Sequence, residues 1–143
     1  MITSRWFKGK KELIEVIKLR KEIFGEGSGE DIYDEFSFNI GIYEDNNNIV
    51  GIGRLLSKEG NFFIDNLGVK KEFQRKYYGD FMLRILIRKA YEIGIDKIYV
   101  QCNEDVVDFF KKLDFKEENS NKDTYLLSRG GDVTSGCCQW YNE

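Results

Sequence analysis

The chain has 143 residues, of which 41% are hydrophobic and 33% charged, and its formal net charge is −3. This length and balance are typical of one globular domain with its own core, and they exclude a disordered chain. The net negative charge is unlike that of a nucleic-acid binder, and the absence of histidine excludes Ser-His and Cys-His catalysis and most zinc sites.

The cysteines and the apolar runs indicate the compartment. Cys102, Cys137 and Cys138 are odd in number and two of them are adjacent, which is not a disulfide framework and suits a reducing environment. No apolar run has the length of a signal peptide core or of a membrane span. We therefore expect a cytoplasmic protein without membrane contact. Cys137 and Cys138 could form a reactive or metal-binding pair or lie in an inert tail.

The first third of the chain predicts a strand, a helix and a loop. Residues 4–8 form a short candidate strand that Gly9 ends, and residues 10–24 carry apolar side chains at helical spacing. Residues 25–34 are rich in glycine and acidic side chains, which predicts a loop. This loop could be a lid or substrate wall, or a plain linker.

The middle of the chain predicts an antiparallel meander. Residues 36–43 and 49–57 read as strands that the turn-forming residues 44–48 join into a hairpin, and residues 62–69 read as the next strand. An amphipathic helix then runs from Tyr78 or Gly79 to residue 93.

The last third predicts a crossover, a second helix and a final pair of strands. Gly94 ends the preceding helix, and residues 97–102 form an apolar strand that should run parallel to strand 62–69. Asn103 is a candidate N-cap for a helix over residues 104–113. Two short strands over residues 116–118 and 124–128 follow.

These elements give the order β-α-β-β-β-α-β-α-β-β. This order predicts an α/β (α+β) fold with a mixed, mostly antiparallel central sheet flanked by helices. We expect a single domain over residues 1–128, with residues 129–143 as a C-terminal tail that belongs to the same domain or is loosely held.

Residues 61–93 form the most informative stretch. A strand leads into a basic loop, glycine closes the loop, and a helix follows. The first N–H groups of a helix lack partners within it, and its dipole favours negative charge at that end. The stretch therefore predicts a phosphate-binding turn.

Three features stand out in the turn and in a later helix: Val69, the sequence of residues 74–79 (QRKYYG) and that of residues 108–115 (DFFKKLDF). With these residues, the turn and the helix resemble the GNAT superfamily of acyl-CoA-dependent N-acetyltransferases. Residues 19–24 (LRKEIF), 34–35 (DE) and 53–55 (GRL) are similar to the ElaA-like branch. The match extends over nearly the whole chain up to about residue 127.

The resemblance implies how acetyl-CoA would bind as co-substrate, with no metal. Its pantetheine arm would follow the backbone of Leu67, Gly68 and Val69, where the strand splays from its neighbour. The pyrophosphate would lie in the turn formed by Gln74, Arg75, Lys76, Tyr77, Tyr78, Gly79 and Asp80. Phe109 or Phe110 would touch CoA if they do not serve only as core aromatics, and Asn103 would bond pantetheine or serve only as a helix cap.

The chain departs from the family pattern at five places, one of which is Asp114, where the family usually has glycine before Phe115. Tyr77 replaces the first glycine of the turn, and Asp80 replaces a small neutral residue, so we expect weaker CoA binding. Phe110 replaces the tyrosine that often protonates the leaving thiolate, and phenylalanine cannot donate a proton. The ElaA-like branch also tends to have a histidine near its end, and this chain has none.

The catalytic residues are predicted in the same region. A backbone N–H near residues 67–69 would polarise the thioester carbonyl, and Asp65 would accept the proton of the amine because it lies two residues before Leu67, on the same strand face. Asp65 could instead mark only a polar strand face. Tyr77 and Tyr78 could replace the missing acid or could pack.

We therefore expect an N-acetyltransferase that moves an acetyl group directly from acetyl-CoA to a primary amine of a small molecule or peptide. The acceptor is not identifiable from the sequence, and we expect no nucleic-acid partner and a monomer or homodimer. The alternative is a non-catalytic acyl-CoA-binding or sensing domain of the same fold. A third reading is an interaction module that only keeps the fold.

Overall fold

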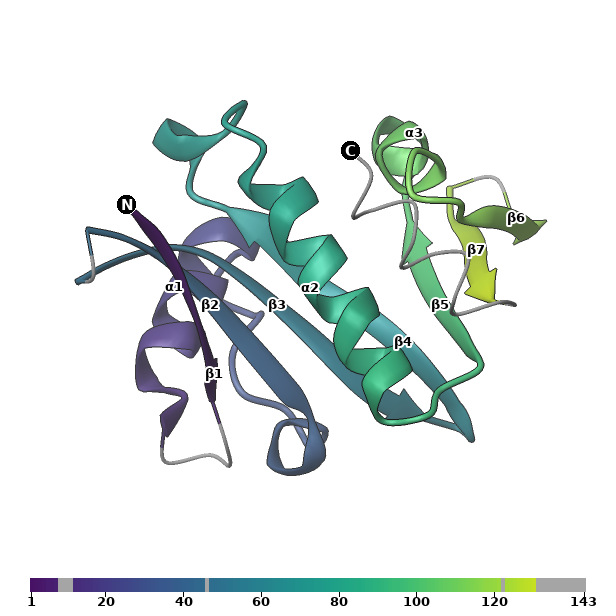
Figure 1. Ribbon diagram of the computed structural model, residues 1–143, viewed down its shortest axis with the longest axis horizontal. Helices are drawn as coiled ribbons and strands as arrows, with labels where there is room; N and C mark the ends of the chain where they lie inside the picture. Colours follow the sequence, from purple (N-terminus) through teal and green to yellow (C-terminus); the bar gives the residue numbers. More distant parts are fainter. Residues whose placement is uncertain (8–11, 46, 122, 131–143) are drawn as a thin grey trace.

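Seven strands form one mixed sheet in the order β1-β2-β3-β4-β5-β7-β6 (Figure 1). The structure is a computed structural model that describes residues 1–7, 12–45, 47–121 and 123–130. The elements are β1 (Ile2–Phe7), α1 (Ile14–Phe24), β2 (Phe38–Glu44), β3 (Asn48–Lys58), β4 (Asn61–Val69), α2 (Tyr78–Glu92), β5 (Lys97–Cys102), α3 (Val107–Lys111), β6 (Lys116–Ser120) and β7 (Tyr125–Gly130). Short 3-10 helices η2 (Asp34–Phe36), η3 (Lys71–Phe73) and η4 (Glu104–Val106) lie between them. The predicted order and fold class are confirmed.

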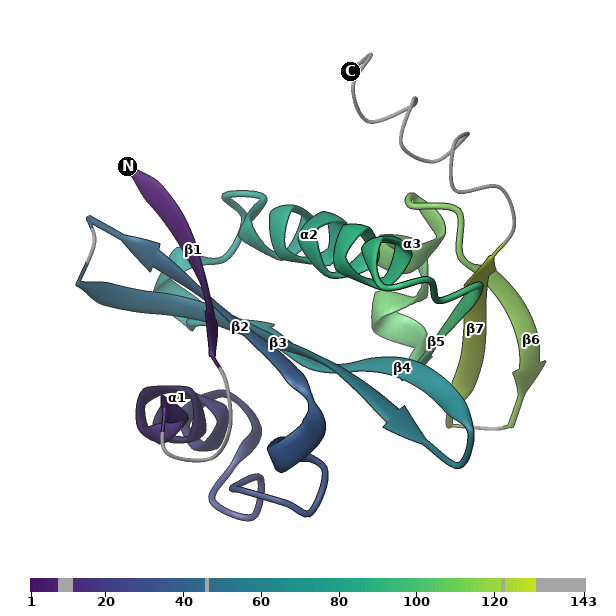
Figure 2. The ribbon, with the colours of Figure 1, turned by 60° about the horizontal axis from the view of Figure 1, so that its bottom comes forward.

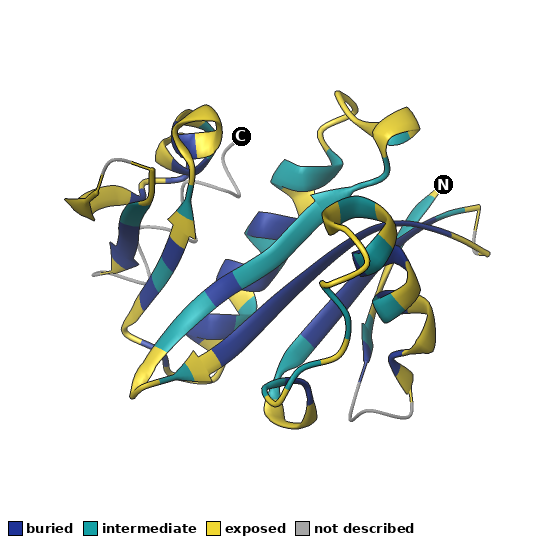
Figure 3. Ribbon diagram, turned by 180° about the vertical axis from the view of Figure 1, so that it is seen from behind, coloured by how far each residue is buried: buried dark blue, intermediate teal, exposed yellow. Residues whose placement is uncertain are grey.

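The helices cover both faces of the sheet. α2 and α3 lie on one face and α1 lies on the other (Figure 2). Periodic apolar side chains of α2, including Leu83, Leu86 and Ile87, are completely buried in the main core cluster. Val16 and Leu19 of α1 are buried in a second cluster on the opposite face. β3 is buried along most of its length because it lies between these two layers (Figure 3).

Some predicted boundaries were wrong. The first helix begins at Ile14 instead of residue 10, although residues 8–11 lie outside the described chain. The second predicted helix is divided into η4 and α3. β7 continues through Gly130, and Arg129, expected in the tail, is 4% exposed and donates from Nε to the carbonyl of Leu113 at 2.8 Å. The tail beyond residue 130 lies outside the described residues, as do Cys137 and Cys138.

β4 and β5 separate after a short contact. They pair in parallel at Phe62–Ile98 and Phe63–Tyr99, and no other residues of the two strands pair with each other in the described part of the chain. β4 remains paired with β3 up to Val69. The two strands diverge toward the end of β4 (Figure 1), so the backbone of β4 beyond Phe63 faces an opening in the sheet.

A β-bulge interrupts β4 close to this opening. Ile52 pairs with Gly68 and Arg54 pairs with Asp65, so that Asn66 and Leu67 together oppose Gly53. Asn66 has a φ of 49°, in the left-handed region. The extra residue changes the alternation of side chains, and the side chains of Asp65 and Leu67 therefore lie on opposite faces of the sheet.

No helix among the described residues is long and apolar enough to span a membrane.

Candidate functional site

A cavity of about 540 Å³ lies between the end of β4, the turn that follows it, and α3. Its lining combines backbone-rich turn residues with aromatic side chains: Leu67, Gly68, Val69, Phe73, Gln74, Arg75, Tyr77, Tyr78, Gly79, Asp80, Val106, Phe109, Phe110 and Lys112. Most of the residues predicted to bind a cofactor meet in this one cavity. Lys76 and Asn103 do not line it.

The turn between β4 and α2 has an unusual backbone. Arg75 and Tyr77 have φ values of 66° and 64°, in the left-handed region. α2 starts at Tyr78, and no side chain caps its first turn. Its leading N–H groups are therefore available to an anion, as the predicted phosphate-binding turn requires. An added Cβ at Gly79 would lie 3.5 Å from the ring of Phe109, which is an ordinary contact.

Several predicted turn residues have partners within the protein. Gln74 Nε2 donates to the carbonyl of Val69 at 3.2 Å, and the Lys76 ammonium lies 5.2 Å from the ring centre of Phe73. Arg84 Nε donates to Asp80 Oδ2 at 2.9 Å. This ion pair offsets part of the negative charge that Asp80 would present to a phosphate.

The two tyrosines of the turn differ. Tyr77 is 85% exposed, whereas the Tyr78 hydroxyl donates to Glu44 Oε2 at 2.6 Å. The hydrogen bond to Glu44, with burial and the nearby negative charge, raises the pKa of Tyr78. Because the Tyr78 hydroxyl already donates its proton to this hydrogen bond with Glu44, Tyr78 is poorly placed to protonate another group.

Phe109 and Phe110 belong to the core and to the cavity wall at the same time. Phe110 is 7% exposed and packs edge-to-face against Phe109 and Phe115, with ring centres 5.1 and 5.5 Å away.

Asn103 accepts a hydrogen bond from the Asp105 N–H at 3.1 Å. Its predicted capping role is confirmed.

Gly68 lies where α1 contacts β4. An added Cβ would come within 2.9 Å of Ile23 Cγ2 and of Phe24 Cζ. Close packing of the helix on the strand therefore explains the glycine on this face, while its backbone borders the cavity.

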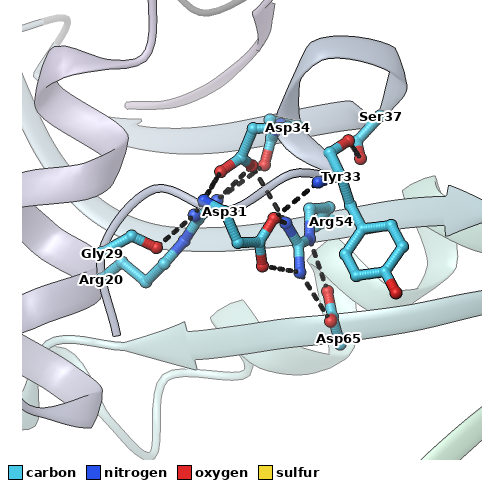
Figure 4. A network of polar contacts seen from close by, with 9 residues as sticks. Arg20, Gly29, Asp31, Tyr33, Asp34, Ser37, Arg54 and Asp65 are labelled. Atoms are coloured by element: carbon cyan, nitrogen blue, oxygen red, sulfur yellow. Dashed lines mark hydrogen bonds and ion pairs between the residues drawn. The ribbon is translucent and has the colours of Figure 1, made fainter. Parts of the chain in front are cut away.

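A polar network occupies the opposite face of the sheet, beneath the acidic loop of residues 25–37 (Figure 4). Arg54, on β3, donates to both oxygens of Asp65 at 2.8 and 2.9 Å and to both oxygens of Asp31 at 2.7 and 3.0 Å. Asp34 accepts from Arg20 at 3.0 and 3.1 Å and from Arg54 at 3.0 Å. The network therefore ties the loop to α1 and to two strands.

Burial and charge oppose one another in this network. Burial alone would raise the pKa of Asp34, but the hydrogen bonds from Arg20 and from the Asp31 N–H, with both guanidinium charges, hold it below its usual value. Burial likewise disfavours the charge of Arg54, yet its bonds to Asp65 and Asp31 raise its pKa above the usual value. Both arginines are thus buried and paired.

The placement of Asp65 corrects the sequence argument. We predicted its side chain on the face of Leu67, and this is wrong because the bulge at Asn66 separates them. The Asp65 side chain points to the face of the Arg54 network, away from the cavity, and is 40% exposed. Along β4 it lies two residues beyond Phe63, the last residue of that strand paired with β5.

Sequence reasoning missed two groups at this face. Asp31 is 40% exposed beside Arg54, and the Tyr33 ring centre lies 6.0 Å from the Arg54 guanidinium carbon. Both come from the acidic loop, whose composition was the available signal. Phe63 and Tyr99 pack across the two strands with ring centres 5.5 Å apart. Glu35, another acidic loop residue, is exposed.

Comparison with known proteins agrees with this geometry. A sequence profile of the acetyltransferase (GNAT) family matches residues 11–115. The matched segment contains both the turn after β4 and the Phe109–Phe110 wall of the cavity.

Solved structures share the fold at low sequence identity. Escherichia coli ElaA is 14% identical, with 90% of this chain and 99% of that chain covered and a TM-score of 0.76. An acyl-CoA N-acyltransferase from Pseudomonas aeruginosa is 15% identical, with coverage of 91% and 100% and a TM-score of 0.76. A GNAT family acetyltransferase from Elizabethkingia anophelis with acetyl-CoA bound is 16% identical, with coverage of 91% and 98% and a TM-score of 0.75.

Proposed function

Because the chain belongs to the acetyltransferase (GNAT) family, we propose that it transfers an acetyl group from acetyl-CoA directly to a primary amine of a small molecule or peptide. The observation that carries the proposal is the cavity at the end of β4, where the strands diverge and an uncapped helix begins. A CoA thioester fits this cavity, because its long amide-containing arm suits the open edge of β4 and its pyrophosphate suits the start of the helix.

Each part of the cavity suits one part of CoA. The backbone groups of β4 beyond Phe63 face the opening, so the amides of pantetheine can bond to them as a neighbouring strand would. The first N–H groups of α2 and the side chain of Arg75 supply positive charge for the pyrophosphate. The relative from Elizabethkingia anophelis carries acetyl-CoA, which supports this choice of ligand.

The reaction needs a polarised carbonyl, a neutral amine and a proton for the sulfur. A backbone N–H of Leu67, Gly68 or Val69 would bond to the thioester oxygen and stabilise the charge that develops on it. The acceptor amine would approach through the opening from the face of the Arg54 network. There Asp65 would accept its proton through a water, since each carboxylate oxygen has a lone pair beyond the one that Arg54 uses.

A non-catalytic acyl-CoA-binding domain is the second candidate. Two observations favour it. Phe110 has no hydroxyl at the cavity wall, and the Tyr78 hydroxyl already donates to Glu44. Neither residue offers a proton to the departing thiolate.

Two measurements test the proposal. Isothermal titration should detect CoA and acetyl-CoA well below millimolar concentration, and thiol release from acetyl-CoA should occur with at least one member of a panel of amines and peptides. Tight binding without thiol release on any acceptor would favour the binding domain. Titrations without heat for either ligand would overturn both candidates.

A matched pair of variants locates the pyrophosphate. Gly79→Glu should abolish CoA binding because it places bulk and negative charge at the start of α2. Gly79→Ala is the control, since its methyl group meets the Phe109 ring at an ordinary distance of 3.5 Å. An unchanged dissociation constant in Gly79→Glu would place the pyrophosphate elsewhere.

A further inference from the structure

Lys112 belongs to the part of the cavity wall that the end of α3 forms. It is exposed, it lines the cavity, and it directly follows α3 in helical conformation. Phe109 lies three residues earlier, so the two side chains lie on one side of the helix. The Phe109 ring would be 3.5 Å from a Cβ at Gly79, which places this side of α3 against the start of α2.

The charge of Lys112 is not used within the protein. Among the described residues its ammonium has no ion pair, hydrogen bond or aromatic contact, whereas Lys76 lies over the Phe73 ring. Among the described residues, Arg75 in the turn and Lys112 after α3 are the two cationic side chains of the cavity lining, and they come from different elements. An anion with two separate phosphate groups would match this arrangement.

CoA has two such groups, the pyrophosphate and the 3′-phosphate of its ribose. We propose that Lys112 binds the 3′-phosphate and makes the cavity selective for CoA over dephospho-CoA, a step that rests on the proposed function. The backbone N–H groups of the turn and Arg75 already face the pyrophosphate position. The second phosphate carries nearly two negative charges at neutral pH, and a flexible lysine reaches it as a point charge.

The α3 helix supplies a matched control. Lys111 precedes Lys112, is also exposed, and lies two residues after Phe109, so that it lies on another side of the helix and does not line the cavity. Lys111→Met and Lys112→Met therefore change the net charge of the protein equally. They differ in whether the lost ammonium lines the cavity.

Isothermal titration with CoA and with dephospho-CoA tests the assignment on the full chain. Wild type and Lys111→Met should bind CoA about 10-fold more tightly than dephospho-CoA, which is typical of one charge-assisted contact. Lys112→Met should lose most of this preference by weakening CoA alone, with dephospho-CoA affinity unchanged. Raising the salt concentration should reduce the preference of wild type in the same direction.

The other outcomes have distinct meanings. Equal weakening of both ligands in Lys112→Met would overturn the assignment, because the ammonium would then contact the pyrophosphate. Equal affinity of wild type for both ligands would also overturn it while leaving the proposed function intact. Absence of binding by either ligand to wild type would overturn the proposed function itself.

Discussion

Tyr77 holds a backbone conformation that its side chain disfavours. Its φ of 64° lies where the family pattern has glycine, and its ring is 85% exposed. A left-handed conformation costs an L-residue about 1–2 kcal/mol. The strain therefore lies in the turn proposed to bind the pyrophosphate.

Replacing Tyr77 with glycine should stabilise the protein and tighten CoA binding. The free energy of unfolding should rise by about 0.5–1 kcal/mol, since relief of the left-handed strain exceeds the extra chain entropy of glycine. Thermal unfolding and titration measure the two effects. Tyr77→Ala is the control because it removes the ring but keeps the strain, and equal unfolding temperatures for the two variants would contradict the backbone explanation.

Phe110→Tyr tests the missing acid. Phe110 lines the cavity and its ring packs edge-to-face against Phe109 and Phe115, so we expect the added hydroxyl to reach the cavity. If protonation of the thiolate limits turnover, kcat should rise by about 100-fold. Phe115→Tyr is the control, since its hydroxyl would enter the core at a site that is 2% exposed and lower stability without raising kcat. An unchanged kcat in Phe110→Tyr would show that the sulfur receives its proton from another source.

At the scale of the element, ion pairs hold the acidic loop against α1 and β3. Its Asp34 is completely buried and joins Arg20 of α1 to Arg54 of β3. Removal of this carboxylate leaves two buried cations without their shared partner. Such losses are strongly destabilising, even where the intact network adds little net stability.

Asp34→Asn should lower the free energy of unfolding by about 3–5 kcal/mol at neutral pH. The folded-state pKa of Asp34 lies below its unfolded value of 3.8, so its stabilising effect is full above that pH and disappears as the pH falls through the folded-state pKa. Urea unfolding at pH 7 and at pH 3 should therefore show a difference between variant and wild type that shrinks in acid. Glu35→Gln, at an exposed neighbour, should change stability little. A difference that stays constant down to the lowest pH would contradict the linkage.

The elements differ in how far the sequence could predict them. Strand β5 and the main body of α2 follow from apolar periodicity, and the cavity-lining turn follows from motif order. The bulge at Asn66 could not be predicted, because its left-handed residue is not glycine and no local pattern marks it. That one residue moved Asp65 to the other face. The Arg20–Asp34–Arg54 network was also hidden, since its members are far apart in the chain and meet only after the sheet forms.

At the scale of the whole molecule, the central sheet has two parts, which pair with each other at two residue pairs of β4 and β5. β1 to β4 form one part, and β5, β7 and β6 form the other. α2 packs on the first part and contributes to the core cluster that both share. A ligand in the cavity would add bonds where the strands have separated.

Hydrogen exchange should report this effect. With CoA at about 100 times its dissociation constant, amides of residues 64–69 and 74–80 should exchange up to about 100-fold more slowly, because binding opposes local opening. Amides of α1 should change little and serve as an internal reference. Uniform slowing across all elements would instead indicate that exchange occurs by global unfolding.

The same two-part sheet has a consequence for how the chain is made. The first part and both of its covering helices are contiguous, over residues 1–92, and β2, β3 and β4 are joined by short antiparallel connections. A ribosome releases the N-terminus first, at about 5–20 residues per second. Strands β1 to β4 can therefore form their sheet, with α1 on one face and α2 on the other, before β5 has emerged from the ribosome. The last strands then need only a short parallel contact and the remaining core surface to complete the fold.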